Sequence, residues 1–189
     1  CDWSSDVCSS DLLALSHLKQ TFDIPILGVI EPGAEAARAV TKSKNIGIIG
    51  TLATIRSEAY EKAIQKLDAS IGTTAKACPL FVPLVEEGWL KGGVPTKIAE
   101  TYLDELVAEG IDTLILGCTH YPLLIPVLEK VVGDNIQIVD SAETTARYAV
   151  QWLNDLGLLD NDSSVGLLEN YVTDLPVRFK RVAHQFLGR

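Results

Sequence analysis

Two short apolar runs, NIGIIG at Asn45–Gly50 and TLILG at Thr113–Gly117, decide the fold class of this chain. Each run closes on a glycine and has the length of a strand, which is too short for a helix. Both are continuously apolar rather than alternating, and this is typical of strands buried on both faces of a parallel sheet. We therefore expect a parallel sheet with helices on both sides.

The same pattern continues on either side of these two runs. Ile24–Ile30 (IPILGVI) and Ile136–Val139 (IQIV) predict two more strands. Helical stretches alternate with the four runs, and the alternation indicates the α/β class with right-handed crossovers. The predicted helices are Ala34–Thr41, Ser57–Leu67, Thr96–Glu109 and one that is capped by Asp140 or Ser141 and ends near Asn154.

The composition describes a folded, acidic protein. Of the 189 residues 47% are hydrophobic, and the formal net charge is −9. The apolar content argues against disorder, and the acidic balance argues against nucleic acid and anionic membranes, since both require clustered Lys and Arg. No apolar run approaches the roughly 18–20 residues of a membrane span, and no signal-peptide pattern is present. We expect a cytoplasmic protein with no nucleic-acid or membrane partner.

In parallel sheets, ligands bind beyond the carboxyl ends of the strands, so those ends are where functional side chains are expected. They carry Glu31–Gly33, Gly50 and Thr51 with Thr54, Gly117–His120, and Asp140 with Ser141. The four cysteines include no C-x-x-C pair and the chain has three histidines, so we expect no metal site.

Cys118 is the most informative of these positions, because Thr119 and His120 follow it directly. Pro122 suits the first turn of a helix, so Cys118 is expected near a helix N-terminus. The helix dipole would stabilise the thiolate and so lower the pKa of the Cys118 thiol below its ordinary value of roughly 8.5. The amides of Thr119 and His120 would bind a substrate carboxylate. The alternative is that Cys118 is a small buried hydrophobe, and the residues alone leave both open. Cys78 has no such neighbour and is expected in the core.

The first twelve residues, CDWSSDVCSSDL, differ from the rest of the chain. They nearly repeat themselves and follow neither hydrophobic period. They resemble a translated cloning or sequencing adapter, so we exclude 1–12 from fold reasoning. With no methionine anywhere, the chain is expected to be a fragment.

Four motifs in register resemble the glutamate racemases. They are LGCTHYPL at Leu116–Leu123, GVIEPG at Gly28–Gly33, CPLFVPLVEEG at Cys78–Gly88 and VDS at Val139–Ser141. The likeness runs from about Leu13 to the C-terminus, and four motifs in the family's order are strong support.

The resemblance implies two α/β domains and cofactor-independent interconversion of L- and D-glutamate, which supplies peptidoglycan synthesis. In that family two cysteines face each other across the substrate α-carbon, one removing the α-proton and the other returning a proton to the opposite face. By resemblance Cys118 is one of the pair, and Thr119 and His120 contact the substrate or assist the thiol. Glu86 has an auxiliary role, with a solvated surface carboxylate as the alternative. Thr51 and Thr54 are expected to bind substrate.

The departures from the family concern its first half. The D-S-G-x-G-G and C-N-T-A-S segments are absent, and Val7 stands where the family has its first cysteine. Cys8 lies one position away and is interpreted as a coincidence. We therefore expect half of a two-base site, and a chain that is not a competent racemase by itself.

The predicted domains are 42–140 and, as an incomplete second one, 13–41 with 141–189. A homodimer is compatible with the resemblance. Two alternatives remain open, namely an aspartate or hydantoin racemase and a non-catalytic module that retains the carboxylate site. A phosphate-binding enzyme is weaker, because the glycines lack the required spacing.

Overall fold

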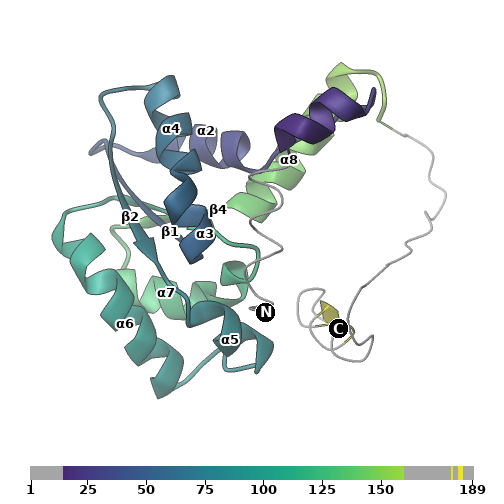
Figure 1. The fold of residues 1–189 in the computed structure, drawn as a ribbon. Coiled ribbons are helices and arrows are strands. Elements are labelled where there is room, and N and C mark those ends of the chain that lie inside the picture. The colour runs from purple at the N-terminus through teal and green to yellow at the C-terminus, as the bar shows by residue number, and fades with distance from the viewer. Residues whose placement is uncertain (1–14, 160–179, 181–182, 185–189) are drawn as a thin grey trace. The chain divides into compact units, whose positions relative to one another are not determined.

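The computed structural model describes residues 15–159, 180 and 183–184. The chain divides into two compact units, Cys1–Trp152 and Leu153–Arg189, which are described separately. The sheet and its helices belong to the first unit (Figure 1). In the second unit the last turn of α8 (Ser141–Asp155) ends in a bond from the Leu158 amide to the Leu153 carbonyl.

A four-stranded parallel sheet is the centre of the first unit, as predicted. Its strands are β1 (Asn45–Gly50), β2 (Gly72–Ala77), β3 (Thr113–Gly117) and β4 (Gln137–Asp140), in the order β2-β1-β3-β4. In register, Gly50 pairs with both Ala77 and Gly117, and Leu116 pairs with Asp140. The carboxyl ends of all four strands therefore meet at one edge.

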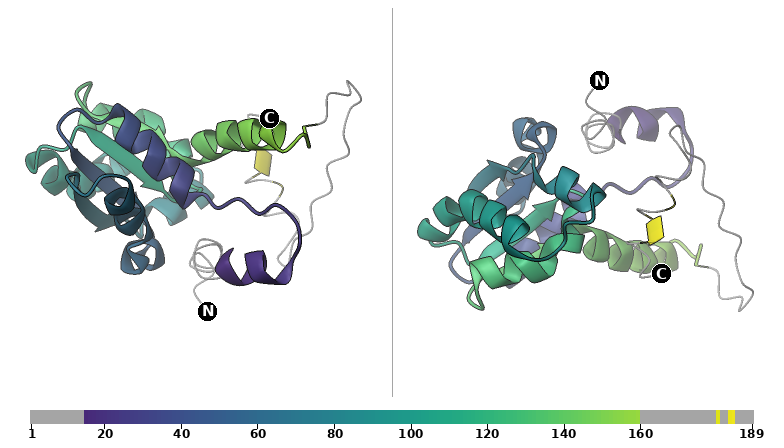
Figure 2. Two further views of the ribbon diagram at one scale, coloured as in Figure 1. Left: turned by 90° about the horizontal axis from the view of Figure 1, so that it is seen from above. Right: turned by 90° about the horizontal axis from the view of Figure 1, so that it is seen from below.

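Helices cover both faces of this sheet, which confirms the α/β class (Figures 1 and 2). The bounds are α2 (Ile30–Val40), α3 (Leu52–Ser57), α4 (Ala59–Leu67), α5 (Phe81–Glu86), α6 (Gly93–Ala108), the 3-10 helix η1 (Tyr121–Leu124) and α7 (Ile125–Val132). Residues 15–21 are also helical.

The core consists of two clusters, one on each face. Ile46 and Ile48 of β1 pack with α2 and α4, whereas Ile49 points to the other face and packs with α5, α6 and α7. All three isoleucines are fully buried, and each such side chain contributes about 1.5–3 kcal/mol. This two-sided burial explains why the run is continuously apolar.

The predicted strand at Ile24–Ile30 is wrong. Residues 25–28 have no regular structure, and the last residue of the run begins α2. Pro32 lies in the first turn of that helix, where its missing N–H costs nothing, so Glu31–Gly33 is helical rather than a turn. Among the described residues the run pairs with no strand. Apolar content alone does not provide a hydrogen-bonding neighbour.

The edge strand β2 was missed because it has no apolar run. Its sequence is GTTAKA, and its residues are half-buried or exposed. An edge strand that is covered less completely needs less apolar surface, and its β-branched threonines suit a pleated backbone. The helix α5 was also not predicted.

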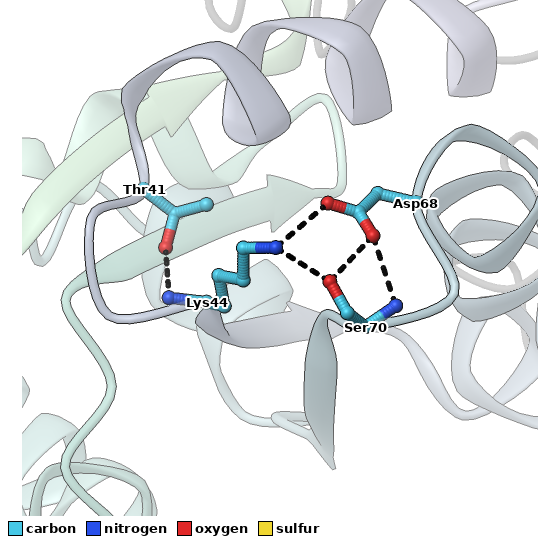
Figure 3. Close-up of polar contacts among 4 residues, drawn as sticks. All are labelled: Thr41, Lys44, Asp68 and Ser70. Atoms are coloured by element: carbon cyan, nitrogen blue, oxygen red, sulfur yellow. Dashed lines mark hydrogen bonds and ion pairs between the residues drawn. The ribbon is translucent and has the colours of Figure 1, made fainter.

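Polar side chains join the loops at the opposite edge of the sheet (Figure 3). Lys44 Nζ lies 3.3 Å from Asp68 Oδ2 and donates to Ser70 Oγ at 2.6 Å, while the Lys44 amide donates to Thr41 Oγ1. Hydrogen bonds from Ser70 and the neighbouring Lys44 lower the pKa of Asp68 to about 2. These groups satisfy one another, so this edge is structural.

No helix within the described part of the chain is both long and apolar enough to cross a membrane.

Candidate functional site

The carboxyl edge of the sheet surrounds a cavity of about 330 Å³. Leu116 and Gly117 at the end of β3, and Cys118 and Thr119 after it, form one wall. The first half of α8 forms another through Ser141, Ala142, Thr145, Ala146 and Ala149. Val29, Ile30, Thr54 and Tyr60 complete the lining, so the cavity is mostly apolar with a few hydroxyls and one thiol.

The neighbours of Gly117 leave little room for a Cβ at this position. A Cβ there would lie 3.0 Å from the Ile49 carbonyl oxygen and 3.0 Å from Tyr60 Cε2. The backbone oxygen belongs to a paired strand and cannot move aside. Glycine is required here because the chain passes directly against β1 and α4 just before Cys118.

Cys118 combines the two roles that the sequence left open. Its side chain is only 5% exposed and packs with the cluster that contains Phe81 and Tyr121. It also lines the cavity, beside Thr119. A thiol in an apolar cavity wall is shielded from water, and this strengthens any base that forms there.

The predicted position of Cys118 near a helix N-terminus agrees with the structure. The 3-10 helix η1 begins at Tyr121, three residues after Cys118, and Pro122 lies in its first turn. The helix α7 follows at Ile125 without a break. That the dipole of this segment favours a Cys118 thiolate stays a prediction.

His120 and Glu86 are brought together, but outside the cavity lining. His120 Nε2 lies 3.8 Å from Glu86 Oε1, and Thr119 Oγ1 lies 3.4 Å from His120 Nδ1. Burial lowers the pKa of His120, and the nearby Glu86 carboxylate opposes this shift. The imidazole is therefore neutral at pH 7 and able to accept a proton. Glu86 is half-buried at the end of α5, in contrast to the exposed Glu87.

Of the three predicted threonines, Thr54 and Thr119 line the cavity and Thr51 does not. Thr51 is the N-cap of α3, and its Oγ1 accepts from the Thr54 amide at 3.2 Å. The two hydroxyls lie 3.0 Å apart and both residues are buried. Thr51 therefore fixes the position of Thr54.

Sequence reasoning missed Tyr60 entirely, and it placed Ser141 at the carboxyl edge of the sheet without giving it a role in the site. Both line the cavity, and their hydroxyl oxygens lie 2.9 Å apart. Ser141 stands in the VDS motif directly after a predicted strand, which was a usable signal. Tyr60 lies within a predicted helix and carried no such signal.

Cys78 is in the core, as expected. It is fully buried, and burial raises the pKa of its thiol to about 12. Its carbonyl accepts a hydrogen bond from the Tyr121 hydroxyl at 2.9 Å. Cys78 and Cys118 are the cysteines of the described residues and only Cys118 lines the cavity, so the cavity has one thiol from this part of the chain.

No group of three or more His, Cys, Asp or Glu side chains in the described segments could hold a metal ion. The thiol and imidazole groups of these residues can transfer protons, and hydroxyls and backbone amides are available to polar ligands.

Known proteins with similar sequences are glutamate racemases. The chain is 50% identical over 175 residues to the glutamate racemase of Geobacter metallireducens, covering 93% of this chain and 65% of that protein. It is 44% identical over 171 residues to one from Neisseria meningitidis, covering 90% of this chain and 63% of that protein. The chain thus spans somewhat less than two thirds of the length of these relatives.

Solved structures agree with the sequence comparison. Glutamate racemase RacE1 of Bacillus anthracis superposes with a TM-score of 0.88 at 37% identity, over 96% of this chain and 68% of that one. The Francisella tularensis glutamate racemase in complex with D-glutamate gives 0.83 at 29% identity, over 96% and 67%. The model of the Asp/Glu/Hydantoin racemase family matches residues 7–149. This chain therefore belongs to the Asp/Glu/Hydantoin racemase family.

Proposed function

We propose that this protein acts in the cofactor-independent interconversion of L- and D-glutamate, which supplies D-glutamate for peptidoglycan. The observation that carries the proposal is the position of Cys118 on an apolar cavity at the carboxyl edge of the sheet. The similarity to glutamate racemases, one of them solved with D-glutamate, supports glutamate as the substrate.

In the proposed reaction the Cys118 thiolate removes the α-proton and the carbanion then takes a proton on its other face. Two groups are needed, because a single base tends to return the proton to the side from which it came. Water exclusion by the apolar walls raises the basicity of the thiolate. The described residues bring one thiol to the cavity, so the second group is to be sought outside them.

The neighbouring side chains are proposed to assist this step. His120, whose neutral form is favoured by burial, lies two residues after Cys118 and would accept the thiol proton, and Glu86 would orient the imidazole from 3.8 Å. Thr54 and Thr119 would bind the substrate through their hydroxyls, with Thr51 holding Thr54 in place. No cofactor enters the scheme.

Deuterium exchange into glutamate tests the proposal. In D₂O, we expect the chain to replace the α-hydrogen of one glutamate enantiomer, as followed by proton NMR, without sustained racemisation in circular dichroism. Cys118→Ala should abolish the exchange, and Cys78→Ala, which removes a buried thiol outside the cavity, should retain it. Exchange that persists in Cys118→Ala, or none with the unsubstituted chain, would refute the proposed role. Sustained racemisation would show that the chain supplies both groups.

An aspartate racemase is the second candidate from the sequence, and the relatives reported above do not favour it. Comparing exchange into L-aspartate and L-glutamate separates the two. A non-catalytic module would bind glutamate without exchanging its α-hydrogen.

We further propose that the protein works in the cytoplasm with no nucleic-acid or membrane partner, and that it can form a homodimer. The net charge of −9 supports the first part. Sedimentation velocity over a range of concentrations tests the second. We also propose that 42–140 forms one domain together with α2, which packs on its sheet, and that the rest of 13–41 and 141–189 belong to another.

A further inference from the structure

We infer that Tyr60 and Ser141 are positioning residues for Cys118, acting through the backbone at the end of β3. This inference rests on the proposed function, since it explains how the proposed thiol is held in place. It begins from a chain of hydrogen bonds that joins three elements. Ser141 Oγ donates to the Leu116 carbonyl at 2.8 Å, and Tyr60 Oη lies 2.9 Å from Ser141 Oγ.

The direction of both bonds follows from the number of protons. A serine hydroxyl has one proton, and Ser141 uses it on the Leu116 carbonyl. The Tyr60 hydroxyl is therefore the donor in the second bond. Tyr60 is 2% exposed and Ser141 is 8% exposed. Because water reaches neither group freely, removing one of these hydrogen bonds leaves buried polar atoms without these partners.

The position of these two hydrogen bonds in the sheet shows which backbone segment they hold in place. The pairing of β3 with β4 ends at Leu116 and Asp140, and Ser141 is the next residue after β4. The Ser141 side chain thus continues the β3–β4 connection by one further bond. Leu116 lies two residues before Cys118, so the bond fixes the backbone from which the thiol projects.

The Tyr60 ring supports the same segment by packing. A Cβ on Gly117 would lie 3.0 Å from Tyr60 Cε2, and a Cβ on Gly33 would lie 3.1 Å from Tyr60 Cε1. The ring is therefore held between two glycines, one in α2 and one immediately before Cys118. Tyr60 and Ser141 both line the cavity, so they limit movement of the Cys118 segment on the cavity side.

Alkylation of Cys118 tests the inference without any substrate. The rate of modification by iodoacetamide is measured against pH, with each cysteine followed separately by peptide mass spectrometry. In Tyr60→Phe we expect the limiting rate at Cys118 to rise about threefold to tenfold, as the loss of one buried hydrogen bond implies, and in Ser141→Ala, which loses both bonds, to rise at least as much. The rate at the fully buried Cys78 should not change.

Thr113→Val is the matched control. Thr113 is fully buried and lies at the end of β3 opposite to Cys118, and the variant removes its hydroxyl, which donates to the Asp112 carboxylate. We expect it to lower stability and to leave the Cys118 rate unchanged. An unchanged Cys118 rate in Tyr60→Phe and Ser141→Ala, or equal rises at Cys78 and Cys118, would overturn the inference.

Deuterium exchange separates this inference from the proposed function. If the unsubstituted chain exchanges glutamate, Tyr60→Phe should lower the rate at saturating glutamate and leave the KM unchanged, because the ring stays in place. If the unsubstituted chain shows no exchange and the alkylation rates still differ as stated, the proposed function fails and the positioning role stands.

Discussion

His120 shows how burial and a neighbouring charge act against each other on one side chain. Burial lowers the pKa of the imidazole, whereas the Glu86 carboxylate 3.8 Å away favours the protonated ring. The neutral ring therefore stabilises the fold above the ordinary histidine pKa of about 6.5. That contribution is lost as the pH falls through the lower pKa of the folded state.

We predict that Glu86→Gln lowers the pKa of His120 further, because it removes the charge that favours the imidazolium. The His120 ring-proton chemical shift, followed by NMR from pH 8 to pH 4, measures the change. Glu87→Gln is the control, since Glu87 is the exposed neighbour of Glu86. Equal titration curves for both variants would mean that Glu86 does not act on the ring.

Three of the four strands were predictable from their apolar runs. The strands β1 and β3 lie inside the sheet and β4 lies at one edge of it, and all three runs were recognised within a residue or two. The other edge strand, β2, has threonines in place of such a run, and Ile24–Ile30 has the run but no partner strand within the part of the chain that the structure describes. The apolar content of a segment predicts how much of it is buried, but it does not predict which other segment it packs against.

The same distinction applies to the candidate site. Cys118, Thr119 and Thr54 were predicted, because polar residues directly after parallel strands point to the carboxyl edge. Tyr60 was not predicted, because it lies within the helix α4 and its hydroxyl contacts Ser141, which is 81 positions away in sequence. Contacts of this range depend on how α4 packs against the sheet, and no local pattern encodes them.

Asp112 connects elements at the opposite edge of the sheet. Its carboxylate accepts bonds from the Thr41 hydroxyl and the Lys42 amide, each at 2.6 Å, and this attaches the loop before β1 to the start of β3. Burial by itself would raise the pKa of Asp112, but these bonds, with those from Ser43 and Thr113, hold the pKa well below its usual range.

We predict that Asp112→Asn lowers the free energy of unfolding by about 1–3 kcal/mol at pH 7, because an amide cannot accept all of these bonds. The folded-state pKa is lowered, so the contribution is present above the unfolded pKa of about 3.9 and disappears as the pH falls further. Urea denaturation at pH 7 and pH 3.5 measures this, with the exposed Asp134→Asn as the control. A difference between wild type and Asp112→Asn that is as large at pH 3.5 as at pH 7 would contradict the assignment.

The helices that unfold together with the sheet define the domain to which the sheet belongs. The boundary predicted between residues 41 and 42 separates α2 from the strands. In the structure, Ala34 and Ala37 of α2 are fully buried in the cluster that contains Ile46 and Ile48 of β1. Unfolding α2 would expose that face of the sheet, so the packing favours a boundary before Ile30.

We therefore predict that the amides of α2 exchange with solvent only when β1 and β3 do, in one cooperative step. Native-state hydrogen exchange at low denaturant concentrations, resolved by NMR, measures the opening free energy of each amide. The helix at 15–21 is the internal reference, because its residues are mostly exposed and it should open at a lower free energy. If α2 opened together with 15–21 and ahead of β1, the boundary would instead lie between 41 and 42, and the buried alanines would hold the helix less firmly than their packing implies.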